Sequence, residues 1–528
     1  MTQAPEHSHR ETGRIARAAG VVSSATMLSR VLGLVRDVVL AACFGAGGAL
    51  DAFLVAFRLP NTLRRLFAEG SLTVAFVPVF VGVMEGEGEE PARRLGRRAL
   101  TLLGAILAGV SVVGVLAAPV LVRLTAWGFA RDPEKFALTV RLTRWMFPYI
   151  ALIGLTALAG GMLNAWGVFA PPALAPVVLN VCLIAAALVL SGWVHPPVLA
   201  LAYGVLLGGV LQLALQWHGL RGVGFRYAPE LPRRDPHIRR IARLMGPAVF
   251  GVAVYQVNIL VSTLLASWLP DGSVSYLYYA ERLFQLPLGV FAVALGTASL
   301  PSLSRLASRR EWEPFRTTLV EALLLTAFVV VPAAAGLLAL AWPIVSVLFE
   351  RGAFDARMVD MTARALAAYA LALVPVAGVR VLAPAFYALE DTRTPVHAAW
   401  WALWVNLGAS LVLMGPLAHV GLALATAVSS AFNLGYLLVR LRGRVGDLGL
   451  GHAAARLLRV AGATLGMTAA VVAGARVAPL EGGGVGAGAA LAGLVGGGAA
   501  LYLALGRLLG LREVDRVLRL VLRAAGRA

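Results

Sequence analysis

The sequence predicts an all-α polytopic membrane protein with about 14 transmembrane helices, in which two parallel six-helix repeats surround a central cavity and two extra helices follow. Three observations predict this fold. Apolar residues make up 59% of the 528 positions and charged residues only 14%. Apolar stretches of about 20 residues, long enough to cross a bilayer as helices, recur from residue 18 to residue 510. A pattern in the first half also returns in the second.

Each predicted span is an apolar stretch that polar or Pro/Gly-rich residues interrupt at both ends. The second span is broken near Glu69-Gly70, and the first contains the charged run SRVLGLVRD. In chain order the predicted spans are 18–44, 49–84, 99–127, 136–163, 170–192, 196–219, 239–268, 274–303, 317–349, 358–389, 395–416, 418–440, 453–476 and 484–509.

The arginine-rich loops predict the orientation and the domain limits. Clusters such as PARRLGRR at 91–98 alternate with nearly uncharged loops such as WVHPP, which places both termini in the cytoplasm by the positive-inside rule. We expect a cytoplasmic tail (1–17), an N-terminal six-helix lobe (18–219), a cytoplasmic linker (220–238), a C-terminal six-helix lobe (239–442), two additional transmembrane helices (443–510) and a basic cytoplasmic tail (511–528).

Two markers reveal the internal repeat. Asp51 precedes Arg58 in DAFLVAFRLP as Ser275 precedes Arg282 in SYLYYAERLFQLP, at an offset of 224 residues. The pair Pro148 and Asn180 returns as Pro375 and Asn406, at offsets of 227 and 226. An even number of spans in each repeat gives both halves the same orientation, an architecture that favours alternating access by a transporter.

Charged residues inside the spans mark the candidate site. One charge at the centre of a spanning helix costs roughly 2.5–3.5 kcal/mol, so six or seven facing lipid would cost on the order of 15–20 kcal/mol. They must therefore line a wet cavity. Arginines exceed carboxylates there, which indicates an anionic cargo with phosphate or carboxylate oxygens. The set comprises Arg30, Arg36, Asp37, Asp51, Arg58, Arg64, Arg65, Glu69, Glu281 and Arg282.

Structural roles compete with transport roles at several of these positions. Arg65 and Glu69 are spaced as an i,i+4 pair, and Asp37 balances the adjacent Arg36. Arg141 and Arg144 are spaced to reach the membrane interface. Lys135 is the only lysine among 46 basic residues, which we attribute as much to coding composition as to chemistry.

The composition and motifs exclude other classes. The net charge of +19 lies between apolar segments rather than on a soluble domain, so nucleic acid is not a partner. Cys43 and Cys182 lack CxxC or histidine neighbours, so we expect inert packing and no metal. The glycine-rich stretch near residue 484 lacks GK[ST] and is not a phosphate loop. No cofactor is expected.

The run SSATMLSRVLGLVRDVVLAACFGAGGALDAFLVAFRLPNTLRRLFAEGSLTVAFVPVF, with YYAERLFQLPLGVFAVALGTASLPSLSR later, resembles the MurJ (MviN) family of the MOP exporter superfamily. The resemblance implies a lipid II flippase that moves the undecaprenyl-pyrophosphate disaccharide-pentapeptide of peptidoglycan synthesis from the cytoplasmic to the outer leaflet of the inner membrane. It also implies substrate-binding roles for Arg30, Arg36, Asp51, Arg64 and Arg282, with the extra helices as a groove for the lipid tail. The family often has lysine where this chain has Arg58.

The resulting hypothesis is a monomeric, non-enzymatic flippase that works by alternating access. Its partners would be lipid II, membrane lipids and the cell-wall synthesis machinery, and membrane potential would drive the return of the empty cationic carrier, with a coupling ion left open. The alternatives are a flippase for another polyprenyl-linked saccharide, a cation-coupled drug antiporter of the same superfamily, and a membrane enzyme. The last would need catalytic carboxylates on a substantial loop, whereas Glu230 and Asp235 stand among arginines.

Overall fold

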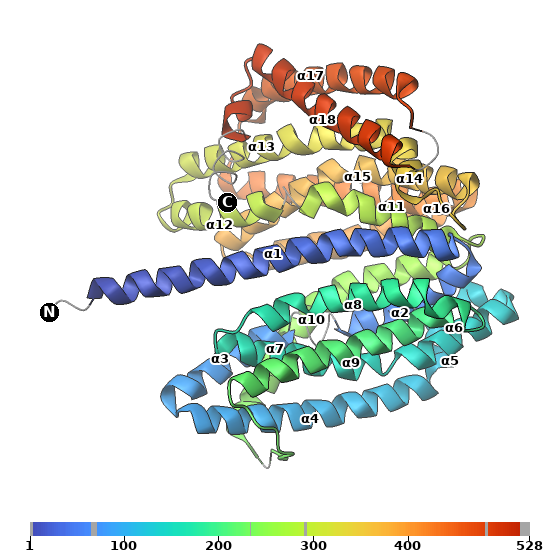
Figure 1. The fold of residues 1–528 in the computed structure, drawn as a ribbon. Coiled ribbons are helices and arrows are strands. Elements are labelled where there is room, and N and C mark those ends of the chain that lie inside the picture. Colours follow the sequence, from blue (N-terminus) through green and yellow to red (C-terminus); the bar gives the residue numbers. More distant parts are fainter. Residues whose placement is uncertain (1–3, 65–70, 233, 290–292, 481–483, 518–528) are drawn as a thin grey trace. The chain divides into compact units, whose positions relative to one another are not determined.

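Helices account for all the regular secondary structure in the described part of the chain (Figure 1). The structure is a computed structural model that describes residues 4–64, 71–232, 234–289, 293–480 and 484–517. The chain divides into two compact units, Met1–Asp271 and Gly272–Ala528.

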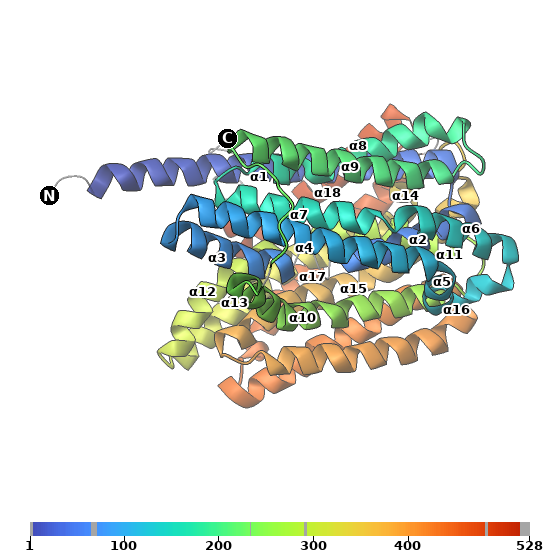
Figure 2. The ribbon, with the colours of Figure 1, turned by 90° about the horizontal axis from the view of Figure 1, so that it is seen from below.

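The described part of the first unit contains ten α-helices. They are α1 (Ala4–Phe44), α2 (Gly48–Arg64), α3 (Ser71–Gly86), α4 (Glu89–Leu116), α5 (Ala118–Thr125), α6 (Pro133–Met146), α7 (Tyr149–Ala165), α8 (Ala170–Leu188), α9 (Leu199–Gly222) and α10 (Pro236–Ala266), with two 3₁₀ turns, Trp127–Arg131 and Leu190–Gly192. Helix α1 packs along α8, α8 packs against α9, and α4 packs against α7 (Figure 2). Helix α10 also belongs to this unit, because it packs against α3.

The second unit contains the remaining helices of the described residues. They are α11 (Ser273–Pro287), α12 (Val293–Ser308), α13 (Trp312–Ala339), α14 (Ala341–Phe349), α15 (Ala356–Ala388), α16 (Arg393–Val445), α17 (Leu450–Val477) and α18 (Val485–Leu508). Helix α15 lies at its centre, in contact with α11, α12, α13, α14 and α16. Helix α17 joins α13 to α18, and the Tyr502 hydroxyl donates a 2.7 Å hydrogen bond to the carbonyl of Phe328.

Helix lengths repeat along the chain as the sequence markers predict. Helices α4 and α13 have 28 residues each and begin 223 residues apart, at Glu89 and Trp312. Helices α3 and α12 have 16 residues each and begin at Ser71 and Val293. The pair α6 and α7 covers Pro133–Ala165, and its counterpart α15 is one helix of the same 33-residue extent.

Nine helices of the described residues are long and apolar enough to cross a membrane. Every other predicted span also coincides with a helix or a pair of helices, except that the expected break near Glu69 lies outside the described residues. Helix α1 is not among the nine, and its apolar stretch is the one that carries Arg30, Arg36 and Asp37. The charges that identify the candidate site are thus also those that weaken the transmembrane signal.

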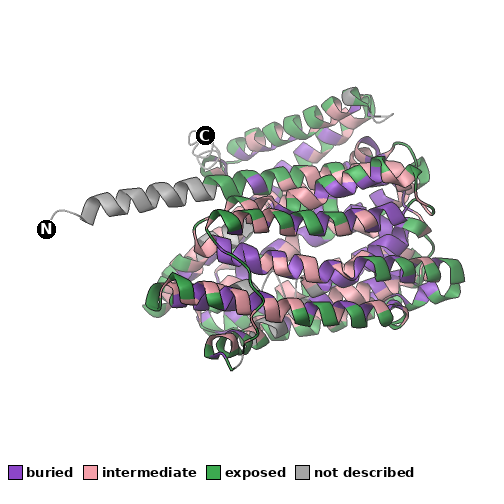
Figure 3. Ribbon diagram, turned by 60° about the horizontal axis from the view of Figure 1, so that its bottom comes forward, coloured by how far each residue is buried: buried purple, intermediate pink, exposed green. Residues whose placement is uncertain are grey.

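Two aromatic clusters sit inside the units, where neighbouring helices meet. In the first unit, Phe76 and Phe80 of α3 pack with Trp166. In the second, Phe315 and Phe386 are fully buried between α13 and α15. Figure 3 shows how buried residues face neighbouring helices while exposed residues cover the opposite faces of the same helices. Exposed apolar faces of this kind are what a helix presents to lipid.

The segment between α9 and α10 is held against α4 by polar contacts. Arg98 Nε donates to Glu230 Oε1 at 2.7 Å and Arg98 Nη1 to Asp235 Oδ2 at 2.9 Å. Burial raises the pKa of Asp235, but the bond from Arg98 and those from the backbone amides of α10 outweigh it, so this pKa lies below its usual range. The predicted linker is therefore an ordered strap along α4.

Candidate functional site

An arginine on α1 is held in place by two neighbours in the first unit. Arg36 donates from Nε and Nη2 to Asp37 Oδ1 at 3.0 and 2.7 Å, and from Nη1 to Asn180 Oδ1 of α8 at 3.0 Å. The Asn180 amide in turn donates to the carbonyl of Ser29 at 3.1 Å. Gly33 permits this approach, because a Cβ there would lie 3.8 Å from the amide nitrogen. Asp37 is only 2% exposed and serves as the counter-charge that orients Arg36.

Arg30 lies on the same helix in a different environment. It is exposed, and within the described residues it makes no hydrogen bond or ion pair. One helix therefore carries a fixed guanidinium and an exposed one six positions apart. An anion could be bound by Arg30 without first breaking an internal ion pair.

Asp51, at the start of α2, belongs to a buried ion cluster with the only lysine of the chain. Lys135 Nζ of α6 lies 3.1 Å from Asp51 Oδ2 and 2.6 Å from Asp271 Oδ1. The side chains of Lys135 and Asp51 are 7% and 1% exposed, and the ammonium also lies 4.0 Å from the ring centroid of Phe129. This cluster ties α2, α6 and the end of the first unit together.

The remaining predicted residues of α2 have mixed outcomes. Arg58 donates from Nη1 to the Thr263 hydroxyl of α10, and Arg64 donates from Nε to Asn61 Oδ1 at 2.9 Å. Arg65 and Glu69 lie outside the described residues. Arg58 and Arg64 thus have polar partners within the first unit, and both also have interactions beyond these.

In the second unit, the predicted charges lie on α11. Arg282 is exposed, and its guanidinium carbon lies 5.0 Å from the ring centroid of Tyr278, whose hydroxyl accepts a 3.3 Å hydrogen bond from Nη2. Glu281 accepts a 2.8 Å hydrogen bond from Gln285. Stacking on an aromatic ring positions a guanidinium while keeping its charge, which suits a residue that binds an anionic ligand.

Three partners of the predicted charges were not predicted. Asn180 was a marker of the repeat, Thr263 belongs to no motif, and Lys135 was attributed to coding composition. For Lys135 a signal existed, because a single lysine among 45 arginines indicates a position where a compact ammonium fits and a planar guanidinium does not. No group of histidine, cysteine and carboxylate side chains in the described residues could hold a metal ion.

Apolar helices that repeat in two halves and carry oriented cations are the architecture of a polytopic membrane transporter. Comparison with solved structures supports this class. A lipid II flippase MurJ in an inward closed conformation matches with a TM-score of 0.77, at 26% identity over 92% of this chain and 98% of that one. An inward-facing multidrug resistance MATE family transporter of the MOP superfamily shares the fold, with a TM-score of 0.66 at 16% identity over 81% and 98%.

The chain belongs to the lipid II flippase MurJ family. The family model, described as Lipid II flippase MurJ, matches residues 40–485. The lipid II flippase MurJ of Burkholderia cenocepacia is 41% identical over 432 residues, which cover 81% of this chain and 84% of that protein. The family predicted from the N-terminal run is confirmed.

Proposed function

We propose that this chain flips lipid II from the cytoplasmic to the outer leaflet of the inner membrane and thereby supports peptidoglycan synthesis. The observation that carries the proposal is its membership in the lipid II flippase family over most of its length. The cationic groups on α1 and α11 fit such a cargo, because guanidinium groups match the oxygens of a pyrophosphate. We further propose that it acts as a monomer, without catalysis, with both termini in the cytoplasm.

In the proposed cycle, Arg30 and Arg282 bind the pyrophosphate and Arg36 contributes from its fixed position. Arg30 and Arg282 are both exposed, so an anion can reach either guanidinium. Asp37 and Asn180 hold Arg36 in one rotamer, which reduces the entropy lost when an anion binds. Bound pyrophosphate lowers the repulsion among these cations and favours closure of the cytoplasmic side.

Complementation tests the function directly. The host's own lipid II flippase is depleted, this chain is expressed, and lipid II in the outer leaflet is measured by its accessibility to an external probe. We expect growth and outer-leaflet lipid II to be restored. Restored growth without outer-leaflet lipid II, or no rescue by a chain that is present in the membrane, would contradict the proposal. Transport of another polyprenyl-linked saccharide in its place would favour the alternative cargo.

The Arg36→Lys variant tests the site. Lysine keeps the charge but cannot bond Asp37 and Asn180 at once, so at least one charge-assisted hydrogen bond is lost. Such a bond is worth about 1.5–3 kcal/mol, and we expect flipping to fall about tenfold to a hundredfold. The matched control is Arg94→Lys on the exposed face of α4, which should flip lipid II at the wild-type rate. Equal rates in both variants would remove Arg36 from the mechanism.

A further inference from the structure

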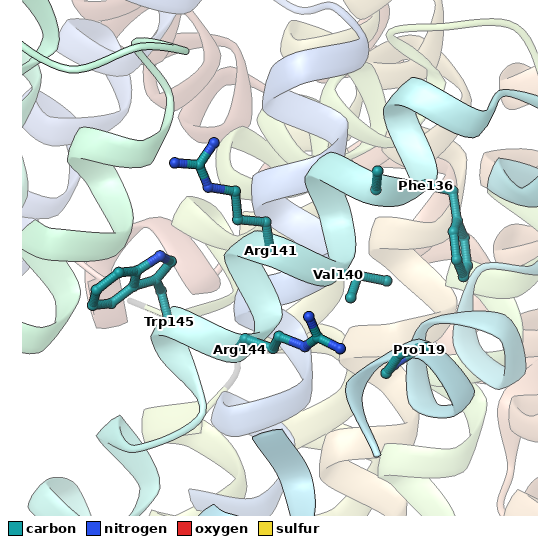
Figure 4. A pocket seen from close by; sticks show the side chains of 7 residues that line it. Pro119, Phe136, Val140, Arg141, Arg144 and Trp145 are labelled. Carbon is teal, nitrogen blue, oxygen red and sulfur yellow. The ribbon is translucent and has the colours of Figure 1, made fainter. Parts of the chain in front are cut away.

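A pocket on the first unit, away from the residues of the proposed cycle, carries two arginines. Its volume is about 410 Å³, and it lies between α5 and α6 (Figure 4). Its lining residues are Pro119, Phe136, Ala137, Val140, Arg141, Arg144 and Trp145. Five of the seven are apolar, so the pocket combines an apolar wall with two guanidinium groups.

Neither arginine is neutralised by the protein. Arg141 and Arg144 are both exposed, and within the described residues neither makes a hydrogen bond or an ion pair. Arg123, on α5, stands over the ring of Phe136 at 5.6 Å and adds a third cation at the edge of the pocket. An excess of cations beside apolar surface calls for an anion that also has apolar parts.

The pocket lies at the level of a membrane interface. Helix α7 has 17 residues, which at 1.5 Å per residue span about 25 Å, close to the roughly 30 Å of a hydrocarbon core. Arg144 and Trp145 come just before α7 and therefore lie near one edge of that core. Trp145 is 44% exposed and packs edge-on against Tyr203 at 5.1 Å, as aromatic residues do at membrane interfaces.

Helix α4 gives the same level and identifies the side. The stretch from Ala99 to Leu116 follows the cationic cluster at 93–98 and covers 18 residues, or about 27 Å. Pro119 lies just beyond its end, at the opposite interface from the cluster. In the proposed topology, this is the outer side, where the loops carry almost no positive charge. Two arginines in one pocket there depart from that distribution.

We propose that this pocket binds an anionic glycerophospholipid of the outer leaflet. Arg141 and Arg144 hold its phosphodiester, Trp145 lies at the level of the glycerol, and the wall formed by Pro119 and Val140 contacts the upper part of an acyl chain. The charge selects an anionic head group, and the apolar wall distinguishes a lipid from a free phosphate. The inference rests on the proposed topology for its side of the membrane and does not require that the chain flips lipid II.

Native mass spectrometry on the purified full chain tests the proposal. The probes are phosphatidylglycerol, phosphatidylcholine with the same acyl chains, and soluble glycerol phosphate. We expect one tight phosphatidylglycerol and no equivalent phosphatidylcholine. The double variant Arg141→Ala/Arg144→Ala should bind phosphatidylglycerol about 30-fold more weakly. Arg141→Lys/Arg144→Lys, which keeps both charges, should bind it more tightly than the alanine pair does.

The matched control removes two other arginines that lie on the outer side in this topology. Arg131 stacks on Trp268 at 4.4 Å, and Arg476 lies exposed in the last turn of α17. Arg131→Ala/Arg476→Ala should bind phosphatidylglycerol as the wild type does, and melting temperatures should show that every variant is folded.

Three results would overturn the proposal. In the first, the Arg141/Arg144 double variant binds phosphatidylglycerol like the wild type, or the control loses binding equally. In the second, glycerol phosphate displaces phosphatidylglycerol at matched concentration, which would make this a free-phosphate site. In the third, lipid II displaces phosphatidylglycerol preferentially and loses affinity in the same double variant, which would make the pocket part of the substrate's path.

Discussion

At the scale of the residue, the buried cluster around Lys135 has the largest expected effect on stability. Replacing Lys135 by Met leaves Asp51, which is 1% exposed, without its ammonium partner. Removing one partner of a buried ion pair costs about 3–5 kcal/mol. We expect the melting temperature of the purified protein to fall by several degrees, as measured by dye-reported thermal unfolding.

The cycle of variants around Lys135 separates the buried charge from packing. Lys135→Met/Asp51→Asn removes both charges and should recover much of the lost stability. A double variant that is as unstable as Lys135→Met would show that the packing of the lysine stem, rather than its charge, holds the cluster together.

Individual charges could be predicted from the sequence, but their partners could not. A charge inside an apolar stretch carries a desolvation cost that is visible in one dimension. The contact between Arg36 and Asn180 joins positions 144 residues apart, and a single asparagine in an apolar helix has no pattern that identifies its partner. Arg65 and Glu69 remain predictions, as do the substrate-binding roles of the whole set.

At the scale of the element, the reversal within α16 is the most constrained backbone. Ala418 has φ 49° and ψ −129°, a left-handed conformation that a non-glycine residue adopts only under constraint. Gly421 follows closely, and a Cβ there would lie 2.3 Å from the carbonyl oxygen of Leu413. This reversal separates the two spans predicted at 395–416 and 418–440.

A substitution at Gly421 tests how tightly this reversal is packed. Gly421→Ala forces backbone atoms apart, and we expect a loss of about 1–3 kcal/mol in stability, read as a lower melting temperature. The matched control is Gly408→Ala in the same helix, where a Cβ would meet nothing within 4 Å. Alanine favours helix there by up to about 1 kcal/mol, so the control should melt at the wild-type temperature or above. Equal destabilisation of both variants would contradict the close approach.

The two ends of α16 meet at Asp391, which predicts a pH dependence. Its carboxylate accepts hydrogen bonds from the amides of Arg393 and Thr394 at 3.0 Å and pairs with Arg444 at 2.8 Å. Burial raises the pKa of Asp391, but the bonds from Thr394 and the charge of Arg444 outweigh it and leave this pKa lowered.

Because the folded pKa of Asp391 is lowered, the carboxylate stabilises the fold above its unfolded value of 3.8, and this contribution is lost as pH falls through the lower folded pKa. We expect the melting temperature of the wild type to fall toward that of Asp391→Asn as pH drops from about 6 to about 3. A difference between the two proteins that stays constant over this range would exclude Asp391 as the titrating group.

Helices were predictable at this scale because length and apolarity are properties of a continuous stretch. Breaks inside the spans were less so. The span predicted at 136–163 is two helices, α6 and α7, separated at Phe147–Pro148, whereas its counterpart α15 continues through Pro375. A proline removes one hydrogen bond in both places, and the surrounding packing decides whether the helix ends.

At the scale of the whole molecule, the duplication explains why the charges come in corresponding positions. Arg58 of α2 and Arg282 of α11 occupy matching places in helices that begin 225 residues apart. Arg58 contacts the Thr263 hydroxyl, whereas Arg282 stacks on Tyr278. The two copies have thus diverged, one arginine bonding to a distant helix and the other staying exposed beside a ring of its own helix.

The excess of arginine also makes a prediction about the energy source of the proposed cycle. An empty carrier with net positive charge in its binding region would be drawn toward a negative cytoplasm, and moving one charge across the full potential is worth roughly 2.3 kcal/mol per 100 mV. In proteoliposomes with a potassium diffusion potential, we expect lipid II flipping to accelerate when the cytoplasmic face is negative and to slow when the sign is reversed. Arg30→Gln removes one cation of the binding region and should reduce the dependence of the rate on potential, whereas Arg94→Gln on the exposed face of α4 should leave it unchanged. Flipping rates that are the same at zero potential and at a potential of either sign would show that the return step carries no charge, and the cycle would then need another source of energy.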